Sequence, residues 1–224
     1  MELNVPVLRA VELYRFYHTG DDEIMALRGV DLTLERGEFA ALVGPSGSGK
    51  STLLACLAGL DEPDGGRVEI MGHRLTRRSE TERARLRARH IGMLMQSGNL
   101  FGHLTIRRNI ELQMKLAGRD ESGRISELLQ GLGIAERADA RPEQLSGGEA
   151  ARAGLAVALA VAPDVLICDE PTAEVDAGTE QSVLDRLEEV CQSGGSVLVA
   201  THSAAVAQRA DRVITIRDGR IADD

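Results

Sequence analysis

Residues 44–51 read GPSGSGKS, and this stretch decides the fold because it fits the phosphate-binding loop pattern G-x-x-x-x-G-K-[ST]. An apolar run at 39–43 precedes it like a buried strand, and a helical run follows at 51–59. Glycines let backbone N–H groups close around phosphate oxygens, and a helix N-terminus adds partial positive charge. Lys50 is expected to reach the outer phosphates, and the Ser51 hydroxyl to ligate Mg²⁺. The stretch therefore predicts a nucleoside triphosphate site.

The composition is that of an ordinary globular protein. The 224 residues, 43% hydrophobic and 27% charged, suffice for one domain with an inserted subdomain. No apolar run approaches the roughly 20 residues that cross a bilayer. A net charge of −9 and a pI of about 5.1 argue against nucleic-acid binding. We therefore expect no nucleic-acid partner, and any membrane-spanning part to come from a partner.

One local stretch, residues 74–89, is rich in arginine. It alternates arginine with acidic and apolar residues, and Ser79 with Glu82 forms a capping-box pattern at its start. We expect a solvated helix here, with a phosphate- or RNA-binding patch as the alternative.

The three cysteines do not form a metal-binding pattern. Cys56 falls in the helix after the phosphate loop and Cys168 in an apolar strand, so both are expected to be small buried hydrophobic residues. Cys191 ends an amphipathic helix and is a candidate exposed thiol. An odd number of cysteines suits a reducing compartment.

Strand and helix patterns organise the chain around the loop. Residues 7–17 and 25–34 read as strands of an antiparallel layer. The middle of the chain, 93–160, is mostly helical. In the last third, strands alternate with helices, which predicts a mainly parallel sheet with covered faces. The picture is an α/β nucleotide domain with a helical insert.

A second glycine-containing motif, LSGGE at residues 145–149, precedes an alanine-rich helix. Ser146 can cap that helix and Glu149 can complete the capping box. The two glycines would let a partner surface approach the helix start closely. The motif predicts a second helix N-terminus that binds phosphate, although an ordinary capped helix would show the same pattern.

Polar side chains follow three of the apolar strands. Asp169 and Glu170 end the strand 165–168, at the sheet edge where ligands of open α/β sheets bind. Asp169 can hold Mg²⁺ through water, and Glu170 can act as the general base that polarises the attacking water. His202 follows another strand and could touch the γ-phosphate, although a histidine after a strand, taken alone, is more often structural. Gln96 follows a third strand and could ligate Mg²⁺ and the water; alone it is uninformative.

Together these motifs carry a family resemblance. They occur in the order found in ATP-binding cassette (ABC) ATPases: the phosphate loop, Gln96, the signature at 145–149, Asp169 with Glu170, the segment Glu174-Val175-Asp176, and His202. The resemblance covers nearly the whole chain. Within the family the chain is similar to the lipoprotein-releasing and macrolide-exporter type, because of ALRGV at 26–30, GLD at 59–61 and glutamate at 149.

The resemblance implies a fold and a domain organisation. It implies a P-loop NTPase (RecA-like) core with an N-terminal antiparallel β-subdomain and an inserted α-helical subdomain. Residues 1–224 would form a single ATPase domain, with 1–92 and 161–224 as the core plus β-subdomain and 93–160 as the helical subdomain.

The resemblance also implies a mechanism. Two cassettes pair head to tail, and each ATP with its Mg²⁺ lies between the phosphate loop of one copy and Ser146, Gly147 and Gly148 of the other. Glu170 activates water, and His202 stabilises the γ-phosphate. The residues implied to act catalytically are Glu170, His202, Gln96 and Lys50, and those implied to hold Mg²⁺ are Ser51, Gln96 and Asp169. The residues implied to contact ATP are Tyr17, Gly44, Pro45, Ser46, Gly47, Ser48, Gly49, Lys50, Ser51, Thr52, Gln96, Ser146, Gly147, Gly148, Glu149, Asp169, Asp176 and His202.

The residue that would stack on adenine has competing candidates. An aromatic residue near the start stacks on adenine in this family; Tyr17 has the best spacing to the loop, and Tyr14 and Phe16 are alternatives.

The implied partners are a second cassette and an integral membrane permease of four-helix export type, on the cytoplasmic face of the membrane. The permease would dock on 97–105 and the helical insert. The alternatives are a cassette working in DNA repair or translation, and a regulatory cassette that binds ATP without hydrolysis.

Overall fold

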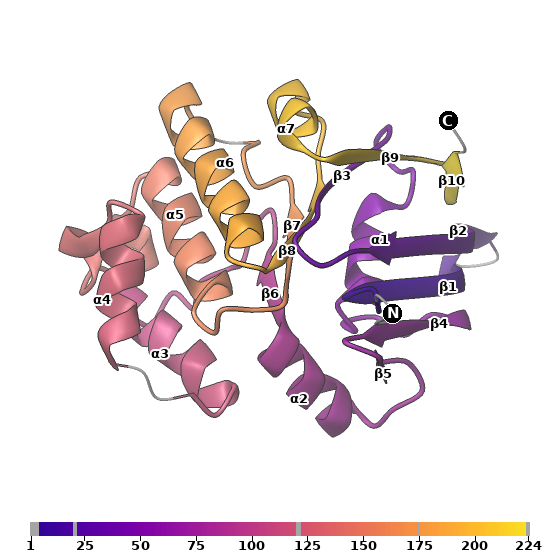
Figure 1. The fold of residues 1–224 in the computed structure, drawn as a ribbon, viewed down its shortest axis with the longest axis horizontal. Coiled ribbons are helices and arrows are strands. Elements are labelled where there is room, and N and C mark those ends of the chain that lie inside the picture. The colour runs from indigo at the N-terminus through magenta and orange to yellow at the C-terminus, as the bar shows by residue number, and fades with distance from the viewer. Residues whose placement is uncertain (1–4, 20–21, 120–121, 174, 223–224) are drawn as a thin grey trace.

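The computed structural model describes residues 5–19, 22–119, 122–173 and 175–222. Its secondary structure forms two sheets and a group of helices at one side (Figure 1). None of the described helices is long and apolar enough to cross a membrane.

The larger sheet carries the phosphate loop. Its strand order is β10-β9-β3-β8-β7-β6, and the neighbours from β9 to β6 run parallel. Only β10 is antiparallel, because an Asp218-Gly219 turn folds it back on β9. The strands are β3 (Phe39–Val43), β6 (Ile91–Leu94), β7 (Val165–Asp169), β8 (Ser196–Ala200), β9 (Arg212–Arg217) and β10 (Arg220–Ala222).

The smaller sheet is antiparallel, with the order β2-β1-β4-β5. Its strands are β1 (Leu8–Thr19), β2 (Asp22–Leu34), β4 (Gly65–Ile70) and β5 (His73–Arg74). The expected β-layer is therefore present, with longer strands than the sequence indicated. The strand expected at 25–34, for example, begins at Asp22.

Seven α-helices and two short 3₁₀ turns connect the strands in the described residues. The helices are α1 (Lys50–Leu57), α2 (Glu80–His90), α3 (Ile106–Leu116), α4 (Ser122–Gly131), α5 (Gly147–Ala158), α6 (Ala177–Gln192) and α7 (Ala204–Arg209). The 3₁₀ turns are η1 (Ala135–Arg137) and η2 (Pro142–Gln144). Helices α3, α4 and α5 form the helical insert on the side away from the antiparallel sheet (Figure 1). The strand β6 spans the position expected as the start of this insert, residue 93.

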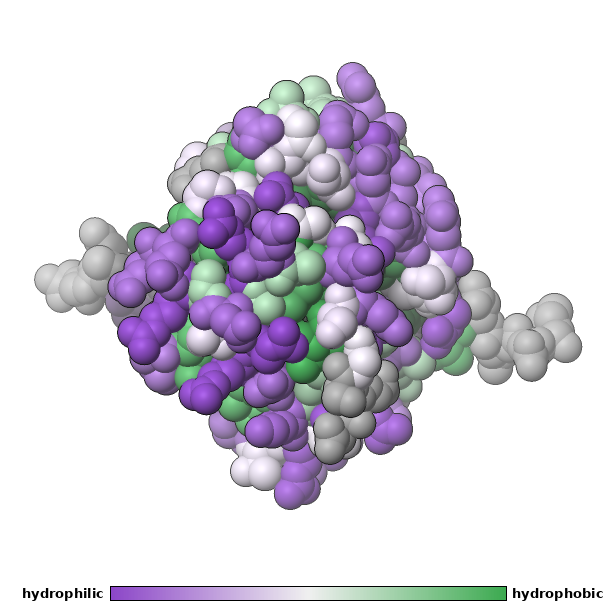
Figure 2. All heavy atoms as spheres, turned by 90° about the vertical axis from the view of Figure 1, so that its left-hand side faces the viewer, coloured by the Kyte–Doolittle hydropathy of each residue, from purple (hydrophilic) through white to green (hydrophobic). Residues whose placement is uncertain are grey.

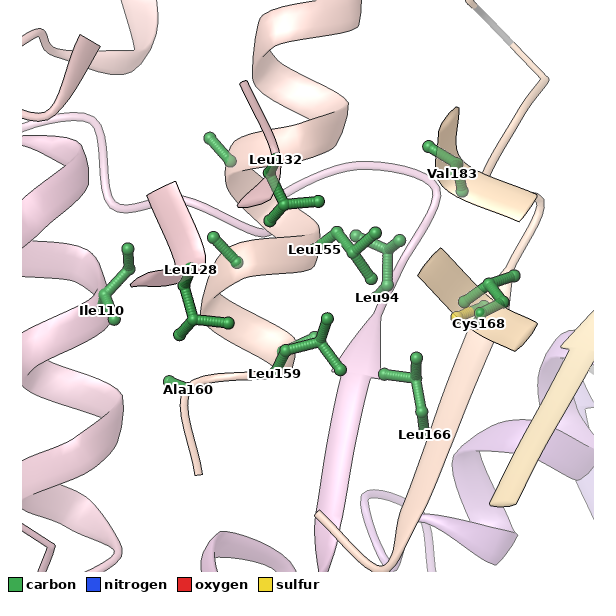
Figure 3. Packing of buried hydrophobic residues seen from close by; sticks show 14 of the residues in the cluster. Leu94, Ile110, Leu128, Leu132, Leu155, Leu159, Ala160, Leu166, Cys168 and Val183 are labelled. Atoms are coloured by element: carbon green, nitrogen blue, oxygen red, sulfur yellow. The ribbon is translucent and has the colours of Figure 1, made fainter. Parts of the chain in front are cut away.

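The parallel sheet separates two hydrophobic cores. Side chains alternate along β7: Leu166 and Cys168 join the core shared with the helical insert, and Val165 and Ile167 join the core shared with α1 and the antiparallel sheet. Figure 3 shows the first core, in which Leu94 of β6 and Leu166 of β7 belong to one cluster with Leu128 of α4 and Leu155 of α5. Every residue of β7 is buried, so core packing on both faces of the strand fixes the position of its end, where Glu170 follows.

The expectations for the arginine-rich stretch and the cysteines were largely correct. Helix α2 begins with the Ser79–Glu82 capping box, none of its residues is buried, and ion pairs such as that of Arg87 with Glu80 cross its surface. Cys56 and Cys168 are buried. The third cysteine, Cys191, is half-buried rather than exposed, and burial raises the pKa of its thiol to about 11.

Candidate functional site

The phosphate loop joins β3 to α1 as the sequence predicted. Its lysine, Lys50, is the first residue of α1, is 7% exposed, and donates hydrogen bonds to the carbonyl oxygens of Gly44 (2.8 Å) and Pro45 (3.0 Å). The N-cap residue of α1 is Gly49, so no side chain caps the helix, and its first turn has no acidic residue. The positive end of the helix dipole is therefore left for an anion.

Two glycines of the loop are required by close packing. A Cβ on Gly44 would lie 2.2 Å from the carbonyl oxygen of Ile216 in β9. Gly49 has a φ of 104°, and its Cβ would lie 2.6 Å from the carbonyl oxygen of Ala26. The loop is thus clamped between β9 and β2, which fixes the direction of its N–H groups.

The two acids after β7 point in different directions because the backbone turns sharply between them. Asp169 ends the strand and is 8% exposed. Glu170 has a φ of 49°, in the left-handed region that a residue with a Cβ seldom adopts. Its N–H donates to the carbonyl oxygen of Ala200 in β8 at 2.9 Å, which holds the backbone in this conformation. Such backbone strain is concentrated at functional sites.

The Glu170 carboxylate is held on one oxygen and free on the other. Oε2 accepts hydrogen bonds from Thr201 Oγ1 (3.4 Å) and from the N–H of His202 (3.2 Å). Oε1 is buried and accepts no hydrogen bond; His202 Nε2 lies 3.4 Å away, without hydrogen-bond alignment. The same imidazole nitrogen lies 3.4 Å from Lys50 Nζ. One carboxylate oxygen, Oε1, is therefore buried without a hydrogen-bond partner.

A cleft of about 880 Å³ brings most of the predicted residues together. It lies at the carboxyl ends of the parallel strands, between the phosphate loop and the antiparallel sheet. The predicted residues that line it are Tyr17, Ser46, Gly47, Gly49, Lys50, Ser51, Thr52, Gln96, Asp169, Glu170 and His202. Gly44, Pro45 and Ser48 belong to the same loop without lining the cleft.

Gln96 is positioned by a loop that the sequence did not reveal. It follows β6 and lines both the main cleft and a smaller neighbouring groove. Asn99 closes this loop: Oδ1 accepts from the N–H of Met95 at 2.7 Å, and Nδ2 donates to the Met95 carbonyl oxygen at 2.6 Å. An asparagine five residues after the end of a strand is too common a pattern to predict this contact.

Tyr17 is the aromatic residue at the cleft, on the long strand β1. Its hydroxyl donates to Asp61 Oδ2 at 2.7 Å, and the guanidinium carbon of Arg15 lies 4.6 Å from the ring centroid. The alternatives Tyr14 and Phe16 do not line the cleft. In the sequence Asp61 stands out only as part of the family pattern at 59–61, and its contact with Tyr17, 44 residues away, carries no local signal.

The signature motif forms the predicted capped helix start. Ser146 caps α5, accepting from the N–H of Glu149, while Glu149 Oε2 accepts from the N–H of Ser146 at 2.8 Å. Arg137 Nε donates to the other carboxylate oxygen at 2.7 Å. The N–H of Ser146 and then Arg137 lower the pKa of the Glu149 carboxyl to about 2. None of the described residues that line the main cleft belongs to 146–149.

Asp176 caps α6 and is tied to the signature helix. Its Oδ1 accepts from the N–H of Thr179 at 3.1 Å, and its Oδ2 from the Thr179 hydroxyl at 2.7 Å. The same hydroxyl accepts from Arg152 of α5 at 3.1 Å, and a Cβ on Gly148 would lie 2.9 Å from it. Thr179 was missed, although its position three residues after a capping aspartate was a usable signal. The expected neighbour Glu174 lies outside the described residues.

The donor set of the cleft fits a magnesium ion. A hydroxyl (Ser51), an amide oxygen (Gln96) and a carboxylate (Asp169) line one cavity. These hard oxygen donors suit Mg²⁺, which is usually bound through one or two carboxylates together with substrate phosphates. Among the described residues, no group of three or more His, Cys, Asp or Glu side chains could hold a metal by itself. Ser51, Gln96 and Asp169 are the residues that would hold Mg²⁺.

A phosphate loop between a buried parallel strand and a helix, with acidic residues at a nearby strand end, defines a P-loop nucleoside triphosphatase. The family model described as ABC transporter matches residues 27–173. The chain belongs to the ABC transporter family, and it is an ATP-binding cassette ATPase.

Relatives and solved structures agree with this assignment. The chain is 41% identical over 222 residues to the macrolide export ATP-binding/permease protein MacB of Hyphomonas neptunium, covering 98% of this chain and 34% of that protein. An uncharacterized ABC transporter ATP-binding protein of Thermotoga maritima is 38% identical over 218 residues, covering 96% and 93%. The chain thus spans about a third of the length of the macrolide-export relatives it matches.

The fold is also that of solved cassettes. A dimeric post-hydrolysis state of the ATP-binding cassette MJ0796, bound to ADP and phosphate, superposes with a TM-score of 0.92 at 32% identity, covering 96% of this chain and 97% of that one. A second dimeric structure of the same cassette gives a TM-score of 0.90. The predicted α/β fold is therefore confirmed.

Proposed function

We propose that this cassette works as one half of a head-to-tail pair that hydrolyses ATP at two shared sites. One observation carries the proposal. The phosphate loop, Glu170 and His202 line one cleft, whereas Ser146 caps a helix outside that cleft. A second copy facing the first would supply its signature helix N-terminus to the γ-phosphate. The dimeric assembly named for the related cassette supports this arrangement.

Within each site the residues take separate roles. Lys50 and the N–H groups of the loop bind the phosphates. Ser51, Gln96 and Asp169 would hold Mg²⁺, which would supply positive charge to offset the charge that develops on the phosphates. The Glu170 carboxylate, at the lining of the cleft, accepts the proton of the attacking water. His202 contacts the γ-phosphate, Tyr17 stacks on adenine, and Asp176 connects the two sites across the interface.

We further propose that the cassette drives an integral membrane permease of the four-helix export type, from the cytoplasmic face of the membrane. Relatives named as ATP-binding/permease proteins for macrolide export support this partner class. The docking surface would be the loop after Gln96 together with the helical insert, where Phe101 is 57% exposed and Leu116 is 65% exposed. The outer face of the insert mixes hydrophilic side chains with smaller apolar areas (Figure 2).

The decisive variant is Glu170→Gln, which removes the base but keeps the size of the side chain. We expect it to bind Mg-ATP, to turn over at least about a hundred times more slowly, and to accumulate as a dimer. Light scattering would detect the dimer, and a phosphate-release assay the turnover. Glu127→Gln, on the exposed face of α4, is the matched control and should behave like the wild type. Rapid turnover by the Glu170→Gln variant would contradict the role of Glu170. A variant that stays monomeric with Mg-ATP, even beside its permease, would contradict the shared site.

A further inference from the structure

We propose that Arg15 and Asp61 are positioning residues that hold Tyr17 as a one-sided stacking platform for the nucleobase. The inference deepens the proposed function and rests on it. It adds two residues, from β1 and from the turn after α1, that do not themselves need to touch the nucleotide.

The first observation is a forked ion pair beside Tyr17, formed by residues that do not line the cleft. Arg15 Nε donates to Asp61 Oδ2 and Nη2 donates to Oδ1, both at 2.8 Å. Nη1 donates to Asp64 Oδ2 at 3.0 Å. The Arg15 and Asp61 side chains are only 20% and 25% exposed, so water screens this pair less than a surface pair. Although burial opposes it, the hydrogen bonds of Arg15 and Tyr17 hold the pKa of the Asp61 carboxyl below its ordinary value.

The second observation is that this ion pair contacts Tyr17 at two places, the hydroxyl and one face of the ring. The hydroxyl is held by Asp61 Oδ2 at 2.7 Å, and the guanidinium covers one face of the ring at 4.6 Å. A cation over an aromatic face is attracted by the ring quadrupole. With one face covered and the hydroxyl anchored, the ring keeps one orientation and offers only its other face to a ligand in the cleft.

The third observation is that the neighbouring aromatic residues, Tyr14 and Phe16, do not line the cleft. The Tyr14 ring packs against Gly65, and a Cβ on Gly29 would lie 2.8 Å from the Tyr14 hydroxyl. Tyr14 therefore covers two glycines of the antiparallel sheet. Neither it nor Phe16 reaches the cleft. A platform for a planar base must be Tyr17, and its geometry depends on Arg15 and Asp61.

The test compares a ligand that has a base with one that lacks it. Isothermal titration with Mg²⁺ measures binding of a non-hydrolysable ATP analogue and of inorganic tripolyphosphate to Arg15→Met, which removes the cation and keeps an apolar side chain. We expect about three- to tenfold weaker binding of the ATP analogue and unchanged binding of tripolyphosphate. Arg15→Lys, which keeps the charge and loses the fork, should show a smaller loss. In steady state, KM for ATP should rise while kcat stays near the wild-type value.

A double-mutant cycle separates positioning from general damage. Tyr17→Ala should weaken binding of the ATP analogue about tenfold. Adding Arg15→Met to that variant should not weaken the binding further. The matched control is Arg67→Met, which breaks the Arg67–Glu69 pair of β4 in the same sheet. Equal losses for both ligands, or a full Arg15 effect in the background of the Tyr17→Ala substitution, would overturn the inference. Neither of these two outcomes would affect the proposed function, which is tested separately by whether the Glu170→Gln variant forms a dimer with Mg-ATP.

Discussion

Glu170 and His202 approach each other twice across the ends of β7 and β8: the N–H of His202 donates to Oε2 at 3.2 Å, and Nε2 lies 3.4 Å from Oε1. Because the same Nε2 also lies 3.4 Å from Lys50 Nζ, the imidazole sits between the proposed base and the phosphate-binding cation. One side chain therefore lies within 3.4 Å of both groups that we propose to act on the terminal phosphate and on the water.

Replacing His202 by alanine should separate catalysis from binding. The backbone N–H of residue 202 would still hold Glu170, so the fold and the affinity for ATP should change little. The contact to the γ-phosphate would be lost, and we expect kcat to fall about a hundredfold. A phosphate-release assay and titration with an ATP analogue measure the two effects. His73→Ala, on the exposed strand β5, serves as the control. An unchanged kcat would show that the imidazole is not needed.

Two glycines of the phosphate loop should respond differently to alanine. Gly49→Ala combines a φ of 104° with a clash, since its Cβ would lie 2.6 Å from the carbonyl oxygen of Ala26. Gly47→Ala has a φ of 77° and no atom within 4 Å, so only left-handed strain of about 1 kcal/mol is expected. Gly49→Ala should lower Tm more and lose ATP binding. Equal thermal shifts for the two variants would mean that the clash is relieved at no cost.

Thr179 should govern how the signature helix is tied to the Asp176 turn. Thr179→Val keeps the size of the side chain but removes hydrogen bonds to Asp176 and Arg152. Because the residue is 6% exposed, the loss should cost about 1–3 kcal/mol of stability. When Thr179→Val is combined with Glu170→Gln, dimer formation should also need more ATP. Thr179→Ser keeps the hydroxyl and should behave almost like the wild type. Urea unfolding and light scattering would detect the difference, and matching results for the valine and serine substitutions would refute the role of the hydroxyl.

The capping box of α5 should make stability depend on pH. The pKa of Glu149 is lowered from its usual 4.5 to about 2, so the ionised carboxylate stabilises the folded state above pH 4.5. That contribution is lost as the pH falls from 4.5 toward about 2. Glu149→Gln removes the titration. Its deficit in urea unfolding relative to the wild type should be largest at neutral pH and shrink in acid. A deficit that does not vary with pH would argue against the ionised cap.

The local parts of the site could be read from the sequence because short-range hydrogen bonds create them. The capping boxes at Ser79 and Ser146 each join residues three apart, and both are present. The phosphate loop likewise depends on its own glycines and on the strand and helix that flank it. The burial of Cys168 followed from the fully apolar strand around it.

Contacts across long sequence distances were not readable in the same way. Register shifts in β1, between Ala10 and Leu13 and again between Arg15 and Phe16, break the two-residue alternation of side chains. For this reason the sequence left Tyr14 and Phe16 as competitors of Tyr17. The interaction that distinguishes Tyr17 joins it to Asp61, 44 residues away.

The sequence by itself determined that the chain has a phosphate loop, a capped signature helix and acidic residues at a strand end, because these patterns depend on neighbours within a few positions. Only the tertiary structure decided which aromatic ring faces the cleft, which Glu170 oxygen stays free, and that Thr179 links α5 to α6. Those outcomes depend on side chains brought together by sheet order and core packing, and a linear pattern does not encode which distant partners will meet.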